Sequence, residues 1–268
     1  MSLNAKGGSI CIENTEMDYI LFGNGNRVLI MIPGLGDGLK TVRGYALPFA
    51  MMYREYAEKY RVYVFSRRNK LPQVFSTRAM AKDIAIAMKE LNIEKADVLG
   101  VSQGGMIAQY LAIDYPEIVN KLCLAVTLSK QNQTVQSVVS DWIEMAKSDN
   151  YKTLFIDTAE KSYSEKYLKK NRWLYPLMGR VGKPKSFERF IILANACLKH
   201  NAYDDLGKIK APTLVIGGAD DKIVTGEASK EIAEKIPDSQ LYMYEGLGHG
   251  AYDEAKDFNQ RVLDFFNN

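Results

Sequence analysis

Six short apolar runs recur along the chain, and in each run nearly every position is hydrophobic. A strand that alternates apolar and polar residues has one face in water, whereas a continuous apolar run is typical of a strand covered on both faces. The runs therefore predict a mostly parallel sheet flanked by helices. They span residues 28–32, 62–65, 98–101, 122–126, 214–216 and 241–244.

The segments around these runs carry other periodicities. Residues 77–91 place their apolar positions on one stripe, which predicts an amphipathic helix. Residues 251–266 have similar spacing and predict a helix near the C-terminus. Near the N-terminus, residues 10–13 and 19–22 are expected to form a hairpin that leads into the sheet.

The alternation of strand and helix stops between residues 130 and 205. This segment has no strong strand signal and carries Trp, Tyr, Phe and Met residues at helical spacing. A loop of this length inside a compact domain is improbable unless it has structure of its own. We predict a helical cap at residues 130–205, inserted into a core made of residues 1–129 and 206–268. Most of its aromatic residues should form the core of the cap, and a few should line a substrate pocket.

The stretch Gly100-Val101-Ser102-Gln103-Gly104-Gly105 lies between a predicted strand and residues 106–111, which are expected to be helical. It contains Gly-x-Ser-x-Gly, and alone this pattern could be a turn with a surface serine. A serine on a sharp strand-to-helix turn exposes its hydroxyl at the edge of the sheet, and the glycines permit the strained backbone. The flanking elements favour this arrangement, with Ser102 as a nucleophile.

A nucleophilic serine needs a base and a group that orients the base. His249 lies on a glycine-rich loop after the last apolar run, from which it can reach back over the sheet. We expect it to be the base, and His200 to be a surface or capping residue. Asp220 and Asp221 follow the run at 214–216, and from the residues alone either could orient His249 while the other caps a helix.

The negative oxygen that forms during attack on a carbonyl needs two backbone N–H donors. One is expected from Gln103, which follows the serine, and the other from Leu35, in the glycine-rich loop after residues 28–32. This loop contains neither of the glycine patterns that bind nucleotide phosphates, so no nucleotide site is expected there.

Taken in this order, the motifs resemble the α/β-hydrolase superfamily, in its small capped branch of esterases and carbon–carbon bond hydrolases. The resemblance covers nearly the whole chain outside the predicted cap. In that family the acid stands three residues after the second glycine of the strand-end turn, which selects Asp221 over Asp220. The chain departs from the family at Pro33-Gly34, where many members carry His-Gly, a difference that concerns the detailed shape of the oxyanion hole. The matching parts are the oxyanion loop, the Ser102 turn, Tyr115-Pro116-Glu117, Gly217-Gly218 with Asp221, and Gly248-His249.

The resemblance implies an α/β-hydrolase fold and a serine hydrolase that acts through Ser102, His249 and Asp221. The expected substrate is a small to medium ester with an apolar part, processed through an acyl-enzyme without metal or organic cofactor. Serine instead of aspartate at the nucleophile position disfavours dehalogenase and epoxide-hydrolase chemistry. One alternative is hydrolysis of a carbon–carbon bond by the same residues, which a basic cap residue facing Ser102 would favour. Another is a ligand-binding or signalling protein that retains the fold.

Composition narrows the partners and the compartment. The 268 residues are 47% hydrophobic and 25% charged, which is typical of a globular protein. The net charge of +3 argues against nucleic acid as a partner. The basic clusters at residues 67–70 and 166–172 are expected to be solvated. The sequence does not indicate an oligomeric state.

Two further features concern the compartment. No apolar run is long enough to cross a bilayer, and Met1 to Ile10 lack the pattern of a signal peptide, so a cytoplasmic protein without membrane association is expected. Cys11, Cys123 and Cys197 have no metal-binding spacing, and Cys123 is expected to be buried within its apolar run.

Overall fold

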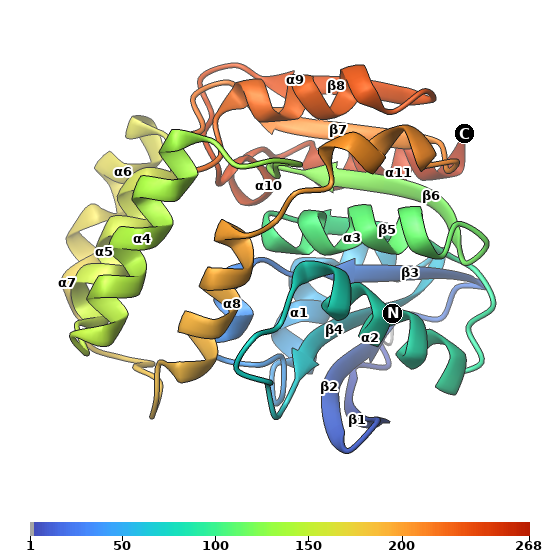
Figure 1. Cartoon of the computed structure of the whole chain (residues 1–268), viewed down its shortest axis with the longest axis horizontal. Coiled ribbons are helices and arrows are strands. Elements are labelled where there is room, and N and C mark those ends of the chain that lie inside the picture. Colours follow the sequence, from blue (N-terminus) through green and yellow to red (C-terminus); the bar gives the residue numbers. More distant parts are fainter. Residues whose placement is uncertain (1–2) are drawn as a thin grey trace.

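The computed structural model describes residues 3–268, and its centre is an eight-stranded sheet in the order β1-β2-β4-β3-β5-β6-β7-β8 (Figure 1). The pairs from β4 to β8 are parallel, whereas β1 and β2 form an antiparallel hairpin that joins the sheet beside β4. The mostly parallel sheet is therefore confirmed. The strands are β1 (Lys6–Ile12), β2 (Thr15–Phe22), β3 (Arg27–Ile32), β4 (Tyr60–Arg68), β5 (Ala96–Val101), β6 (Val119–Ala125), β7 (Thr213–Gly218) and β8 (Ser239–Tyr244).

Each apolar run overlaps one of these strands because the central strands are covered on both faces. Successive residues point to opposite sides of the sheet, so Leu29 and Ile30 belong to two different hydrophobic cores. Cys123 of β6 is fully buried as expected and packs as a small hydrophobic residue.

Helices cover both faces of the sheet. The first core contains residues of α2 (Thr77–Glu90), α3 (Gln103–Asp114) and α9 (Gly226–Lys235). The second core, on the other face, contains residues of α1 (Ala46–Met52) and α11 (Phe258–Asn267). Two short 3₁₀ helices, η1 (Leu35–Gly38) and η2 (Arg54–Tyr56), lie in the connections.

The single helix expected at residues 251–266 is wrong, because two helices form there. The first, α10 (Ala251–Glu254), ends where Ala255 takes an extended backbone conformation, and α11 begins at Phe258. The two helices have different partners. Carboxylates of α10 accept hydrogen bonds from Tyr163 and Ser164, whereas α11 buries its apolar stripe against the sheet.

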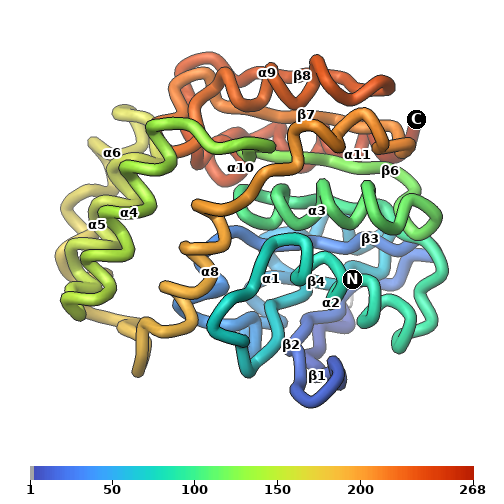
Figure 2. Tube along the Cα trace, in the orientation of Figure 1, coloured from blue at the N-terminus to red at the C-terminus, as the bar shows by residue number. Residues whose placement is uncertain are grey.

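Between β6 and β7 the structure places a helical insertion, defined here as α4 to α8. Figures 1 and 2 show α4 to α7 grouped at one end of the molecule, with α8 between them and the sheet. Trp142, Phe187 and Phe190 are buried in a hydrophobic cluster of the insertion. The helices are α4 (Gln133–Lys147), α5 (Tyr151–Ser162), α6 (Glu165–Asn171), η3 (Arg172–Leu174), α7 (Tyr175–Met178) and α8 (Glu188–Leu198), followed by η4 (Tyr203–Lys208), which crosses the boundary expected at residue 205.

His200 is buried rather than at the surface, which corrects the sequence-based expectation. Its Nδ1 lies 2.9 Å from Thr77 Oγ1, and its Nε2 lies 3.3 Å from Gln109 Oε1. Because the Gln109 amide nitrogen donates to Leu128 O, the Gln109 oxygen faces His200 as an acceptor. His200 is therefore neutral with its proton on Nε2, and burial lowers its pKa to about 3.

We predict that His200 makes the free energy of unfolding depend on pH. The unfolded imidazole binds a proton near pH 6.5, whereas the folded one does so only near pH 3. Stability is therefore lost as the pH falls from 6.5 towards 3, by up to about 1.4 kcal/mol per pH unit. In His200→Asn this contribution is absent. Urea denaturation between pH 5 and pH 7 should give a flatter dependence for the variant, and equal slopes would refute the assignment.

Candidate active site

Ser102 lies on a tight turn between β5 and α3, with φ of 54° and ψ of −120°. Such a left-handed conformation is strained for a residue with a side chain and needs support from its surroundings. Ser102 N donates to Ala125 O (2.9 Å), and Gly105 N donates to Ser102 O (2.9 Å). A Cβ on Gly104 would lie 1.8 Å from Ile32 O, so only glycine permits α3 to approach β3 this closely. The predicted strand–turn–helix arrangement is thus present.

The structure brings Ser102, His249 and Asp221 into one chain of hydrogen bonds. His249 Nε2 lies 2.9 Å from Ser102 Oγ, and His249 Nδ1 lies 2.7 Å from Asp221 Oδ2. The three residues follow β5, β8 and β7, so they meet at the carboxyl ends of parallel strands. A proton on Nδ1 leaves Nε2 free to accept the proton of the serine hydroxyl.

Asp221 is buried and uses both carboxylate oxygens. Oδ2 faces His249, while Oδ1 accepts hydrogen bonds from the N–H groups of Ile223 (2.7 Å) and Val224 (2.9 Å). Burial alone would raise the pKa of Asp221, but His249 and the two N–H groups outweigh it, so the pKa lies below its usual value. Asp220 is exposed, and Asp221 is the one that contacts the imidazole.

The two expected oxyanion donors begin two helices close to Ser102. Leu35 is the first residue of η1 and Gln103 is the first residue of α3. The N–H groups in the first turn of a helix have no acceptor within that helix, so they are available to an oxyanion. A Cβ on Gly34 would lie 3.7 Å from Ser102 Oγ, so the loop that carries Leu35 passes beside the serine hydroxyl.

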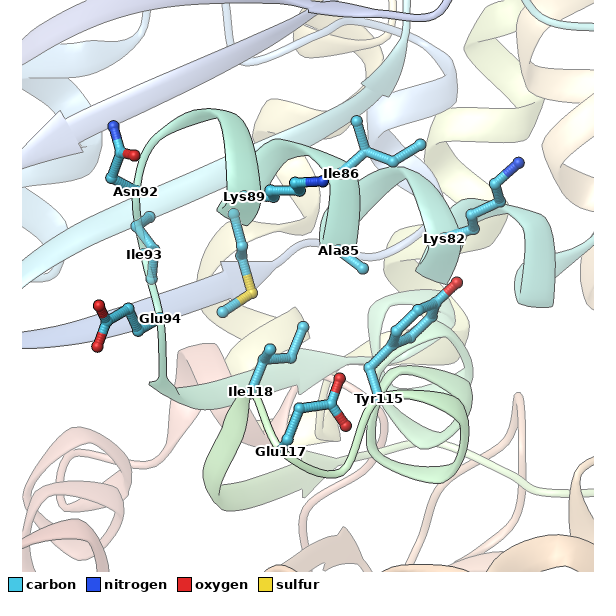
Figure 3. Close-up of a pocket in the computed structure, with 11 residues that line it drawn as sticks. Lys82, Ala85, Ile86, Lys89, Asn92, Ile93, Glu94, Tyr115, Glu117 and Ile118 are labelled. Atoms are coloured by element: carbon cyan, nitrogen blue, oxygen red, sulfur yellow. The ribbon is translucent and has the colours of Figure 1, made fainter.

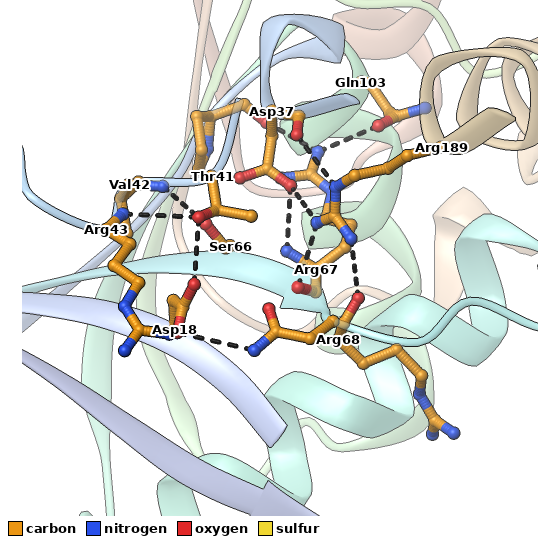
Figure 4. A network of polar contacts seen from close by, with 12 residues as sticks. Asp18, Asp37, Thr41, Val42, Arg43, Ser66, Arg67, Arg68, Gln103 and Arg189 are labelled. Atoms are coloured by element: carbon orange, nitrogen blue, oxygen red, sulfur yellow. Dashed lines mark hydrogen bonds and ion pairs between the residues drawn. The ribbon is translucent and has the colours of Figure 1, made fainter. Parts of the chain in front are cut away.

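Arg67 holds these two donor segments together. It was expected to be solvated with its basic neighbours, but it is buried at the end of β4. Its Nη2 donates to Pro33 O (2.6 Å) and to Gln103 Oε1 (3.0 Å) (Figure 4). The Gln103 amide nitrogen then donates to Leu193 O of α8 (2.7 Å). Burial lowers the pKa of Arg67 to about 10 despite the opposing effect of Asp37, so the guanidinium remains charged at neutral pH.

Arg189 of α8 completes this network from the insertion. Its three guanidinium nitrogens donate to Asp37 O (3.0 Å), Asp37 Oδ2 (2.7 Å), Arg67 O (3.0 Å) and Arg68 O (2.7 Å) (Figure 4). Asp37 Oδ2 also accepts from the backbone N–H of Arg67 (3.0 Å). Asp37 lies in η1, so the insertion is bonded directly to the loop that carries the Leu35 donor.

The insertion also contacts the loop that carries His249. Gly250 N donates to Ser162 O at the end of α5 (2.7 Å), and Ser164 N donates to the Glu254 carboxylate (3.0 Å). These bonds fix the chain immediately after the imidazole. The loop of His249 and the loop of Leu35 are therefore both held from the same insertion.

A cavity of about 1150 Å³ borders this site at Asp221 and Gly248, and a second hollow lies away from it. A groove of about 490 Å³ lies between α2 and the connection from α3 to β6, lined by Ile86, Lys89 and Tyr115 among others (Figure 3). It is at the end of the sheet opposite Ser102, because it borders the end of α3 and the start of β5. Among residues 3–268, no cluster of His, Cys, Asp or Glu is arranged to hold a metal ion, and no helix has the length and hydropathy to cross a membrane.

A sequence model of the α/β hydrolase fold matches residues 27–256. The chain belongs to the α/β-hydrolase family. The α/β-hydrolase fold and the superfamily resemblance are thereby confirmed.

Relatives and solved structures extend this comparison. The AB hydrolase superfamily protein YisY from Bacillus subtilis is 30% identical over 199 residues, which cover 70% of this chain and 72% of YisY. A 2-hydroxy-6-oxononadienedioate/2-hydroxy-6-oxononatrienedioate hydrolase from a Pseudomonas species is 26% identical over 255 residues, 91% of this chain and 89% of that protein. The structure of the enol-lactonase from Burkholderia xenovorans LB400 matches with a TM-score of 0.82 at 19% identity, over 97% of this chain and all of the other, and shows the shared fold.

Because Asp220 and Asp221 are adjacent, the expected role of Asp221 can be tested against a matched control. We expect Asp221→Asn to lower kcat by about 10⁴-fold, because an amide cannot accept from both the loop and His249 Nδ1–H and so disturbs the imidazole tautomer. Asp220→Asn, one position away and exposed, should leave kcat near the parent value. Steady-state hydrolysis of p-nitrophenyl acetate measures both. Equal losses in the two variants would contradict the role of Asp221.

Arg67→Met should lower kcat by about 10²-fold with a much smaller change in KM, because displaced oxyanion donors weaken transition-state stabilisation more than substrate binding. Arg67→Lys keeps the charge and should recover part of the loss. The rates must be compared at equal folded fraction, measured by circular dichroism. A folded Arg67→Met protein with the parent kcat would show that Arg67 does not position the donors.

Proposed function

We propose that this chain is a serine hydrolase of carboxylic esters, with Ser102 as nucleophile, His249 as base and Asp221 as the residue that orients the base. The observation that carries the proposal is the hydrogen-bonded chain from Asp221 through His249 to the strained Ser102. A serine becomes a nucleophile through an adjacent base that a third group orients, and the arrangement has each of these parts.

In the proposed reaction Ser102 Oγ attacks the carbonyl carbon while His249 Nε2 takes the hydroxyl proton. The carbonyl oxygen becomes negative and accepts hydrogen bonds from the N–H groups of Leu35 and Gln103. The carbon–oxygen bond to the alcohol then breaks, and His249 returns the proton to the leaving alkoxide. Water repeats the two steps on the acyl-enzyme, which releases the acid and restores Ser102. Asp221 stabilises the imidazolium throughout.

The insertion supports a substrate with an apolar part. The partly buried Leu35 packs against a cluster of the insertion that includes Val138, Trp142 and Phe190. Apolar side chains therefore adjoin the residue that supplies one proposed oxyanion donor. Pockets for small molecules are mostly apolar with a few placed polar groups, which fits an ester whose acyl or alcohol part is hydrocarbon.

Hydrolysis of a carbon–carbon bond is the second candidate, because the Pseudomonas relative named for such a substrate aligns over 91% of this chain. A basic residue of the insertion that faces Ser102 would favour an acidic substrate of this kind. Arg189 reaches the ends of the central strands, but its guanidinium nitrogens bond to Asp37, Arg67 and Arg68. Because these bonds engage the Arg189 guanidinium, it is not free to bind an acidic substrate, and this supports the neutral ester.

The decisive experiment compares the parent protein with Ser102→Ala. We expect the parent to hydrolyse p-nitrophenyl acetate and butyrate and to be labelled by a fluorophosphonate probe, and we expect both activities to disappear in the variant because the nucleophile is missing. Equal turnover in the two proteins would remove Ser102 from the mechanism.

The same assay separates the alternatives. Faster turnover of a 2-hydroxy-6-oxodienoate than of any ester in an acyl-chain-length panel would favour carbon–carbon cleavage. Tight ligand binding in a thermal-shift screen, with no turnover of either class, would favour a binding or signalling protein.

A further inference from the structure

The outer side of the helical insertion exposes a group of large apolar side chains. They lie in the segment 165–185, which comprises α6, η3, α7 and the following turn, and which we call the outer segment. Trp173 is 75% exposed, Leu177 62%, Met178 47% and Val181 68%. Single exposed apolar residues are ordinary, but a contiguous group marks a surface that contacts something apolar.

Backbone geometry brings two of these side chains to one side. The helical turns continue beyond α7, because Arg180 N donates to Leu177 O (3.0 Å) and Val181 N donates to Met178 O (3.0 Å). Both bonds join residues three apart, as in a 3₁₀ turn, and in such a turn residues three apart lie on one face, so Met178 and Val181 point the same way. Tyr175 points to the opposite side, where it is buried with Leu168 and Ala159. The apolar residues therefore face outward because the inward face is already filled.

The outer segment is also strongly basic. It has seven basic residues and one acidic residue, whereas the whole chain has a net charge of only +3. Arg172 pairs with Glu160 and Glu165, and Lys183 pairs with Asp149. The other five have no ion pair among residues 3–268: Lys166, Lys169, Lys170, Arg180 and Lys185. All seven cationic side chains are exposed.

We propose, in place of the sequence-based expectation of no membrane association, that the outer segment docks this chain on an anionic lipid surface. Leu177, Met178 and Val181 would enter the boundary between headgroups and acyl chains, and Trp173 would lie at headgroup depth. Lys169, Arg180 and Lys185 would contact anionic headgroups, whereas Lys166 and Lys170 line a cavity that also contains carboxylates. A second copy of the chain fits less well, because a two-fold interface would bring the same cations face to face. A nucleic acid fits less well because it offers no acyl region to aliphatic side chains. The inference goes beyond the proposed ester hydrolysis and does not rest on it.

Vesicle binding tests the proposal without any turnover. We expect the full chain to sediment with phosphatidylcholine vesicles that contain phosphatidylglycerol, to bind pure phosphatidylcholine at least tenfold more weakly, and to be released by salt. The chain has two tryptophans, and Trp142 is buried in the insertion. In a Trp142→Phe background the emission of Trp173 should therefore shift to shorter wavelength on binding. Absence of both sedimentation and shift with the anionic vesicles would overturn the proposal.

Matched variants separate the outer segment from general effects. Leu177→Ser and the pair Lys169→Glu with Lys185→Glu should each weaken binding at least tenfold. Leu241→Ser changes an exposed leucine of β8. Lys89→Glu at the end of α2 (Figure 3), combined with Lys95→Glu before β5, makes the same charge change. These controls should bind within twofold of the parent. A loss of binding in the controls as large as in the outer-segment variants would overturn the proposal.

Two further measurements test whether the variants stay folded and whether the chain forms a dimer. Thermal unfolding of each variant should match that of the parent, because the changed side chains are exposed. Light scattering without lipid should give one mass at all concentrations. A dimer that Leu177→Ser dissociates would assign the outer segment to a second copy and overturn the proposal.

Discussion

The arrangement of the candidate active site depends on the close contact between α3 and β3. Residue 104 has no room for a side chain, since a Cβ there would lie 1.8 Å from Ile32 O. This contact aims the start of α3 at the end of β3 and leaves Ser102 beside Gly34. Ser102 and the loop that carries Leu35 meet because they follow adjacent central strands, and Asp221 and His249 reach them from the ends of β7 and β8.

Much of this could be predicted from local patterns. A strand buried on both faces has apolar residues at nearly every position, so each central strand could be recognised from its own sequence. Ser102 and His249 stand within short glycine-rich motifs whose backbone geometry depends on their own residues. Asp221 needed the family resemblance, because local chemistry alone does not distinguish two adjacent aspartates. The structure distinguishes the two aspartates, because Asp221 is buried and accepts hydrogen bonds from two N–H groups of the following loop.

The remaining features depend on partners far away in the chain. Arg67 looks solvated beside other basic residues, and its burial depends on η1 and on Arg189, which is 122 residues away. His200 is buried next to Thr77, its hydrogen-bond partner, which is 123 residues away. Polar residues of this kind carry no periodic signal, because their partners and not their neighbours decide whether they can leave water. The break at Ala255 has the same origin, since α10 bonds to the insertion and α11 packs on the sheet.

The two attachments of the insertion have a consequence for its motion. Arg189 ties α8 to η1, and Ser162 and Ser164 tie the end of α5 to the chain after His249. A swing of the insertion as a rigid body would break both attachments together and pull His249 away from the loop that carries Leu35. An opening of the insertion at these two attachments would therefore also disturb the geometry around Ser102 and His249. Amide hydrogens of α8 and of the Ser102 turn would then exchange with solvent through the same opening.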